Sequence, residues 1–254
     1  MLFISNRSFS RRAGPGDRPW PAVFIMSRCS NPVPRQLLLF LILLFFLSTH
    51  SFAEAEFPPG SSREPDLVEL VQLDSTIHLD IRYATSNNFM GRPMYAKAKA
   101  YLQRPAAEAL VRVHRGLSGQ GYGLLVFDGY RPWSVTKKFW DETPPEKRGF
   151  VADPAIGSRH NRGCAVDLSL FDLKTGKEVA MPSGYDEFTE RASPAYKGGT
   201  SEGRRCRDLL RSAMESEGFR VNSGEWWHFD YNNWEEYDIL DITFEGLERE
   251  SVSD

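Results

Sequence analysis

The segment that most constrains the fold of this chain is 157–172, which reads GSRHNRGCAVDLSLFD. From Ala165 the residues alternate, so a strand here would carry Asp167 on a face of small residues and aliphatic side chains on the other face. The polar stretch before the strand contains His160, and the residues Asn161-Arg162-Gly163 permit a turn back over the strand. The segment therefore predicts a histidine and a carboxylate that face each other at the start of a core strand.

The rest of the chain supplies further strands and helices of ordinary length. The patterns predict strands at 75–83, 123–127, 219–221 and 226–231, and helices from Pro105 to Leu117, at 133–141 and at 201–217. These elements predict a single α+β domain, with a central antiparallel sheet and flanking helices.

The N-terminal region differs in kind from the rest of the chain. Residues 37–47 read LLLFLILLFFL, with Arg28 and Arg35 before them and Ala53-Glu54-Ala55 after them. A basic flank, a short apolar run and small residues at alternate positions are typical of a secretory signal peptide. The run is too short for a comfortable membrane span, although an uncleaved anchor is the alternative. We expect a signal peptide over 1–55, with Met26 as a possible true start, and export to the periplasm.

Beyond the signal peptide the sequence predicts three parts: a Pro/Ser-rich linker at 56–66, a folded domain at 67–235 and a tail at 236–254. Cleavage would remove six Arg and two acidic residues, which leaves a chain more acidic than the formal net charge of -3 indicates. We do not expect an acidic chain of this kind to bind nucleic acid, because it would be repelled by the phosphates. We also expect no membrane span in the chain that remains after cleavage. The oligomeric state stays open.

Two cysteines remain after cleavage, Cys164 and Cys206. In an exported protein they could form a disulfide, but two cysteines do not make a disulfide framework. Buried free thiols are the slightly favoured alternative, with Cys164 packing on the apolar face of its strand.

Two pairs of histidine and carboxylate stand out in the folded domain: His160 with Asp167, and Glu225 with His228. Two histidines and one carboxylate are a common ligand set for catalytic zinc, and a second carboxylate can serve as general base. Residues three apart cannot share one face of a strand, so Glu225 is expected in the turn after Gly224, with His228 on the strand. Spacing alone leaves ordinary hydrogen-bonded pairs equally open.

The other two histidines have simpler interpretations. His78 falls on the solvent-facing side of its predicted strand, and His114 lies within a predicted helix, one position from its apolar stripe. We assign neither a role in the site.

The two pairs lie within motifs that carry a resemblance. The patterns S-x-H-x-x-G-x-A-x-D at 158–167 and E-x-W-H at 225–228 resemble the paired signature of the zinc D-Ala-D-Ala metallopeptidases. That group includes lysostaphin-type enzymes and the hedgehog domain. The segments DIRYAT at 80–85, NF at 88–89 and DGYRP at 128–132 further resemble the VanX-type D-alanyl-D-alanine dipeptidases, and the resemblance covers roughly residues 66–235.

The resemblance implies a role for each matching residue. It implies one zinc ion bound by His160, Asp167 and His228, with Glu225 as the base that activates the attacking water and Arg131 as the group that stabilises the oxyanion. It also implies that Ser158 lies beside the site. It further implies that Tyr83 and Asp186 hold the ends of a dipeptide.

The function implied is zinc-dependent hydrolysis of D-alanyl-D-alanine, a small D,D-dipeptide of peptidoglycan metabolism. One alternative is a D,D-carboxypeptidase that trims peptidoglycan stem peptides, and the loops at 85–99 and 183–200 would decide between the two by closing the pocket or leaving it open. A non-catalytic, zinc-containing protein that binds the cell wall is a second alternative, and the presence of both Glu225 and Arg131 argues against it.

Overall fold

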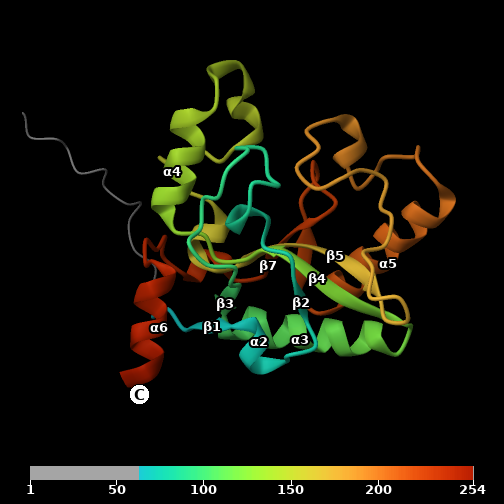
Figure 1. Cartoon of the computed structure of the whole chain (residues 1–254), viewed down its shortest axis with the longest axis horizontal. Helices are drawn as coiled ribbons and strands as arrows, with labels where there is room; N and C mark the ends of the chain where they lie inside the picture. The colour runs from blue at the N-terminus through green and yellow to red at the C-terminus, as the bar shows by residue number, and fades with distance from the viewer. Residues whose placement is uncertain (1–62, 254) are drawn as a thin grey trace, which may run out of the picture. The chain divides into compact units, whose positions relative to one another are not determined.

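The computed structural model describes residues 63–253, so the predicted signal peptide and most of the predicted linker lie outside the described residues. The helices, shown in Figure 1, are α2 (Leu70–Leu73), α3 (Arg104–Ser118), α4 (Trp133–Glu142), α5 (Ser201–Ser216) and α6 (Phe244–Ser253). The strands are β1 (Leu67–Glu69), β2 (His78–Leu79), β3 (Tyr101–Gln103), β4 (Tyr122–Asp128), β5 (Ala165–Asp172), β6 (Phe219–Val221) and β7 (His228–Tyr231).

A five-stranded sheet organises the domain, in the order β2-β4-β5-β7-β6. The pairs β4–β5, β5–β7 and β6–β7 are antiparallel, and only β2 runs parallel to its neighbour. A separate pair, β1 and β3, is also antiparallel. The predicted α+β class is therefore confirmed, and the parallel edge strand makes the sheet mixed.

The strand predicted at 75–83 is much shorter in the structure. Its ladder spans only β2, after which the Asp80 N–H donates to the Val126 carbonyl and the chain closes into a 3₁₀ turn at Arg82–Ala84. Ile81 and Tyr83 are nevertheless buried. The alternation correctly marked the buried side chains, but a turn that folds over the core satisfies the same pattern as a strand.

The sheet is covered differently on its two sides. Helix α3, which Pro105 opens as expected, runs beneath the sheet in Figure 1, with Leu110 and Leu117 fully buried. Helix α4 and the loop at 183–200 lie above the sheet in the same view. Long loops on one side of a packed sheet are where a site can form on a rigid support.

The segment after residue 235, set apart as a tail by the sequence, packs on the same core. Tyr237, Phe244 and Leu247 are buried, and the Leu240 N–H donates to the Asn161 carbonyl. An isolated bridge joins Arg63, the first described residue, to Tyr237 in this segment.

Three further observations concern the cysteines, the surface and membrane spans. Cys164 and Cys206 are both buried as free thiols.

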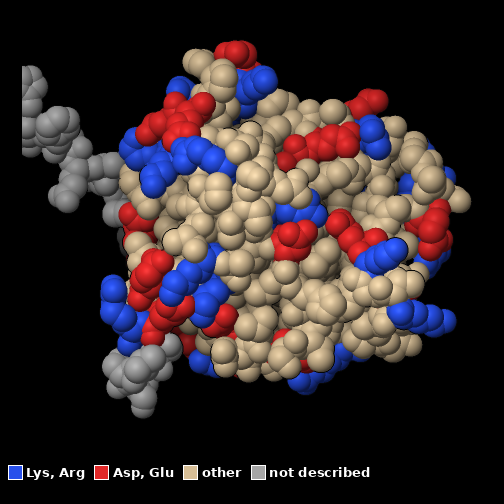
Figure 2. All heavy atoms as spheres, viewed as in Figure 1, with Lys and Arg blue, Asp and Glu red and all other residues tan. Residues whose placement is uncertain are grey.

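Acidic and basic side chains are interspersed over the face shown in Figure 2. No helix among residues 63–253 has the length and apolar character needed to span a bilayer.

Candidate metal centre

Three neighbouring strands place acidic and basic side chains in one row. A register shift in the β4–β5 ladder between Val126 and Asp128 sets Asp128 opposite Asp167. On the other side of β5, Asp167 is the partner of His228 at the start of β7. Directly paired residues point to the same face of a sheet, so this row forms the floor of a polar site.

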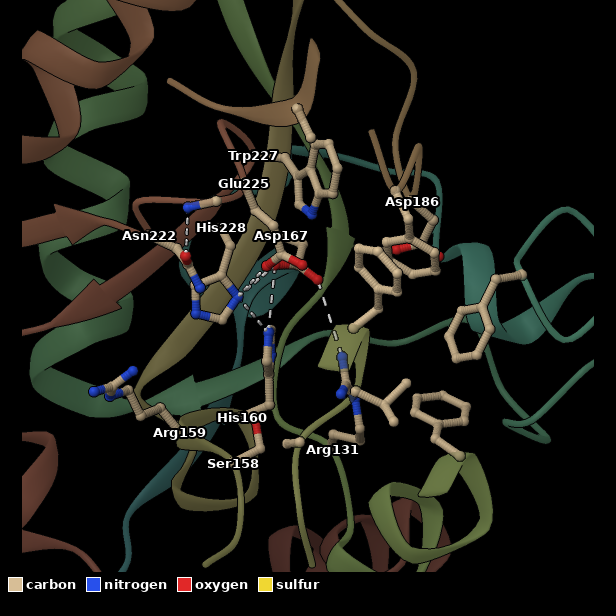
Figure 3. Close-up of a pocket in the computed structure, with 18 of the residues that line it drawn as sticks. Arg131, Ser158, Arg159, His160, Asp167, Asp186, Asn222, Glu225, Trp227 and His228 are labelled. Atoms are coloured by element: carbon tan, nitrogen blue, oxygen red, sulfur yellow. Dashed lines mark hydrogen bonds and ion pairs between the residues drawn. The ribbon is translucent and has the colours of Figure 1, made fainter. Parts of the chain in front are cut away.

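A short 3₁₀ turn at Arg159–Arg162 brings His160 to the same place. The His160 N–H donates to Ser158 Oγ (3.2 Å), and the Ser158 N–H donates to Asn161 Oδ1 (2.7 Å), which together cap the turn. Gly163 ends the turn at φ 69°, where a Cβ would also collide with Leu67. The predicted turn back over the strand is present, and it aims the imidazole at Asp167 (Figure 3).

The three side chains converge within a space suited to one ion. His160 Nε2 lies 3.1 Å from His228 Nδ1, and Asp167 Oδ1 lies 3.3 Å and 3.0 Å from these nitrogens. All three candidate ligand atoms lie within 4.8 Å of one another.

The outer ring nitrogens determine which atoms carry protons. His160 Nδ1 lies 2.7 Å from the Gly129 carbonyl, and His228 Nε2 lies 2.9 Å from Asp230 Oδ1, so both outer nitrogens donate. In neutral imidazoles the facing nitrogens are then lone pairs, and the buried Asp167 Oδ1 accepts no hydrogen bond. Three converging lone pairs without a donor fit a bound cation, and two imidazoles with one carboxylate suit zinc.

The pKa values of Asp167 and His228 also indicate that this cluster favours a bound positive charge. Burial raises the pKa of Asp167, but the two neighbouring histidines more than offset it and hold that pKa well below its usual range. Burial lowers the pKa of His228, whereas Asp167 and Asp230 raise it to about 10. The cluster stabilises a positive charge, and a metal ion would take the place of a proton there.

Arg131 lies beside this cluster, at the end of β4. Its Nε and Nη2 both donate to Asp128 Oδ2, at 3.0 Å and 2.7 Å, and Nη2 lies 4.0 Å from Asp167 Oδ2. Burial lowers the pKa of Arg131, but Asp128 and other anionic neighbours raise it well above its usual value. The guanidinium is thus held charged and in a fixed orientation.

Glu225 lies in the turn before β7, as the spacing predicted. Its Oε2 is 3.9 Å from His228 Nδ1. Burial raises the pKa of Glu225, and the charge of His228 opposes this rise only in part. A carboxylate with a raised pKa next to a cation site can accept and return a proton near neutral pH.

Tyr83 and Asp186 meet at the far side of the same cavity. The Tyr83 hydroxyl donates to Asp186 Oδ2 at 3.2 Å, and Asp186 adopts a left-handed φ of 56°. Burial, together with the charge of Asp167, raises the pKa of Asp186 to about 8. A half-buried carboxylate in an uncommon backbone conformation suits the binding of a cation such as an ammonium group.

One cavity of about 700 Å³ contains the site. All eight residues singled out by the sequence line it: Tyr83, Arg131, Ser158, His160, Asp167, Asp186, Glu225 and His228. The loops at 85–99 and 183–200 contribute to the cavity wall through Phe89 and Asp186. The cavity that they enclose extends well beyond the three candidate metal ligands.

Sequence reasoning missed the residues that hold the ligands in place. Asp230 shares the strand face of His228 two positions before it, and period-two alternation could have found it. Asp128 lies within the quoted DGYRP segment but was assigned no role. The Tyr185 hydroxyl donates to Asp167 Oδ2 at 3.0 Å, and no local signal marks it.

A family model and curated relatives each match more than half of this chain. Residues 63–243 match the family model described as D-ala-D-ala dipeptidase. The chain is 31% identical over 175 residues to the D-alanyl-D-alanine dipeptidase of Escherichia coli K12, covering 69% of this chain and 89% of that protein. It is 36% identical over 181 residues to the D-alanyl-D-alanine dipeptidase of Enterococcus faecium, covering 62% and 88%. Among solved structures, the LdcB LD-carboxypeptidase gives a TM-score of 0.42 at 21% identity, over 69% of this chain and 72% of that one.

Proposed function

The chain belongs to the D-Ala-D-Ala dipeptidase family, and from this premise we propose that it hydrolyses D-alanyl-D-alanine to two D-alanines with one zinc ion held by His160, Asp167 and His228. The observation that carries the proposal is the convergence of three buried lone pairs beside Glu225. A zinc ion at this position would polarise the scissile carbonyl and lower the pKa of water.

Glu225 is the proton carrier in this proposal. Its carboxylate takes a proton from the attacking water as the oxygen forms a bond to the carbonyl carbon. It then gives that proton to the amine that leaves when the C–N bond breaks. The raised pKa of Glu225 favours uptake of the proton from water, because the protonated carboxyl is tolerated in this half-buried position.

Arg131 supplies a fixed positive charge for the developing oxyanion. Asp128 accepts from Nε and Nη2, and this bidentate contact fixes the guanidinium next to Asp167. A preorganised guanidinium next to the reacting carbonyl stabilises the transition state more than the ground state.

Polar groups on the cavity wall suit the binding of a dipeptide with a free ammonium end. Asp186, with Tyr83 beside it, can accept the substrate ammonium, and the Ser158 hydroxyl can donate to the substrate. A carboxypeptidase substrate would present an amide to Asp186 in place of an ammonium, which leaves this half-buried carboxylate without a cation. Asp186 therefore favours a dipeptidase over a carboxypeptidase.

We also propose that the protein is exported to the periplasm, where it would act on dipeptides derived from the cell wall. The support is the order of basic flank, apolar run and small residues over 28–55. Cell fractionation with mass spectrometry of the mature N-terminus tests this, and an intact Met1 or Met26 in the cytoplasmic fraction would refute it.

The activity is tested with zinc-loaded protein, by measuring release of D-alanine from D-Ala-D-Ala and from a muropeptide pentapeptide. We expect hydrolysis of the dipeptide, and activity on the pentapeptide alone would refute the dipeptidase. Glu225→Gln should lower kcat by about 10²–10⁴-fold while zinc stays bound, because only the proton carrier is lost. Unchanged hydrolysis in Glu225→Gln would refute the mechanism.

A further inference from the structure

The cavity has an apolar side that the chemistry of D-Ala-D-Ala does not use. Four phenylalanines line it, Phe89, Phe139, Phe150 and Phe188, and we call them the aromatic wall. The volume of about 700 Å³ falls in the range, roughly 300–1,000 Å³, that holds ligands of drug size. A dipeptide with two methyl side chains would leave much of this space without a contact.

The aromatic wall is continuous from the protein interior to the surface. Phe139 on α4 is buried and contacts Phe89 with ring centroids 5.1 Å apart. Phe89 in turn meets Phe188 at 5.6 Å, and Phe188 stacks on Phe150 at 4.8 Å. The four rings come from α4, from a 3₁₀ helix at Pro145–Phe150 and from two loops, so separate segments of the chain combine to build one apolar surface.

The outer end of the aromatic wall is exposed to a degree that folding alone does not explain. Phe150 is 51% exposed, and Ile156, which also lines the cavity, is 74% exposed. Among the described residues Leu173, at 44%, is the only other large apolar side chain in the exposed class. Two exposed apolar side chains that line the same cavity offer a surface to an apolar ligand group.

The position of the aromatic wall relative to Asp186 indicates which part of the substrate meets it. Phe188 follows Asp186 by two residues, and Phe89 packs edge-on against Tyr83, whose hydroxyl binds Asp186. In Figure 3 Asp186 lies on the other side of the ligand cluster from Arg159. If Asp186 binds the substrate ammonium, as in the proposed function on which this step rests, the side chain of the first residue lies nearest the wall.

We infer that the site takes D,D-dipeptides whose first residue carries a bulky apolar side chain, and that the aromatic wall selects for that side chain. The wall then determines specificity without touching the reacting atoms. Each methylene that the wall buries is worth about 10-fold or more in kcat/KM, so a leucine side chain should gain measurably over alanine.

The experiment compares kcat/KM for D-Ala-D-Ala, D-Leu-D-Ala and D-Ala-D-Leu with the zinc-loaded protein. We expect D-Leu-D-Ala to be hydrolysed at least as efficiently as D-Ala-D-Ala. In Phe188→Ala the ratio of D-Leu-D-Ala to D-Ala-D-Ala should fall by about 10-fold, and Phe188→Leu should restore part of it. Phe150→Ala, at an exposed position that folding tolerates, should lower the ratio in the same direction by a smaller factor.

Leu173→Ala is the matched control, because it removes an exposed apolar side chain that does not line the cavity, and its ratio should equal that of the wild type. A wild type that hydrolyses D-Ala-D-Ala but disfavours D-Leu-D-Ala overturns this inference alone. So does a Phe188→Ala ratio that stays constant, or a change confined to D-Ala-D-Leu. A protein that hydrolyses none of the three overturns the proposed function as well.

Discussion

Two buried histidine environments in this protein differ in what faces the second ring nitrogen. His114, on α3, accepts the Leu124 N–H at Nδ1 (3.1 Å), so its Nε2 carries the proton. That proton is donated to Thr76 Oγ1 at 2.9 Å, and Thr76 donates to Asp74 Oδ1 at 2.5 Å. Each of these side chains therefore has a hydrogen-bond partner within the protein.

At the candidate metal centre one ring nitrogen of His160 is held as in His114, but the other ring nitrogen has different neighbours. His160 is also fixed by a backbone group, the Gly129 carbonyl, but its other nitrogen faces His228 and Asp167, which offer acceptors in place of a donor. Burial and a nearby carboxylate are common to both environments. The difference is that the hydrogen bonds around His114 are complete, whereas the ligand cluster lacks one positive charge.

The largest effect is expected from removing one of the three candidate metal ligands. His160→Ala should abolish stoichiometric zinc binding and lower kcat/KM by about 10³-fold or more, because carbonyl polarisation and water activation are lost together. Elemental analysis of the purified protein and a D-alanine release assay measure the two effects. His78→Ala, at an exposed histidine, should keep its zinc, and a His160→Ala protein with one zinc per chain would contradict the assignment.

A smaller effect is expected from Asp230, which contacts the candidate ligand His228 through its outer ring nitrogen. Asp230→Ala should weaken zinc binding by about 10–100-fold, because the carboxylate no longer holds His228 with Nδ1 facing the ion. Titration against a zinc chelator gives the affinity, and Asp208→Ala, which removes an aspartate with an exposed side chain, serves as control. An unchanged affinity in Asp230→Ala would mean that the strand backbone alone orients His228.

The residues that converge at the candidate metal site, His160, Asp167 and His228, could be selected from the sequence because the features that mark them are local. The alternation around Asp167 and the position of Glu225 in a turn before His228 depend on neighbours in the chain. All eight residues selected from the sequence line one cavity.

What the sequence did not predict depends on segments that are distant in the chain. The register shift that sets Asp128 opposite Asp167 is a property of two strands together. Tyr185 reaches Asp167 from a loop, and Gly129 acts through its backbone carbonyl, which carries no residue signal. His114, expected at most at a core edge, is buried because Leu124 and Thr76 complete its hydrogen bonds.

Because both ring nitrogens of His114 have hydrogen-bond partners within the protein, substitution of His114 should lower stability without changing catalysis. His114→Leu should lower the free energy of unfolding by about 1–3 kcal/mol, because the buried Leu124 N–H loses its acceptor. Chemical denaturation measures the loss, and zinc content and kcat should stay at wild-type values. His78→Ala should change the free energy of unfolding by less than about 1 kcal/mol, and an equal loss in both variants would contradict the distinction.

The smallest effect concerns the pH dependence of that stability difference. Burial lowers the pKa of His114 below its usual 6.5, and the charge of Asp74 opposes this only in part. Between the folded pKa and 6.5 the unfolded chain therefore binds more protons, so the contribution of neutral His114 is complete above about pH 6.5 and declines as the pH falls. The free energy of unfolding of wild type minus that of His114→Leu should shrink from pH 7.5 to pH 5, by at most about 1.4 kcal/mol per pH unit. Measured in excess zinc, this difference cancels proton effects at the metal centre, and a difference that grows toward acid would mean that His114 is protonated in the folded state.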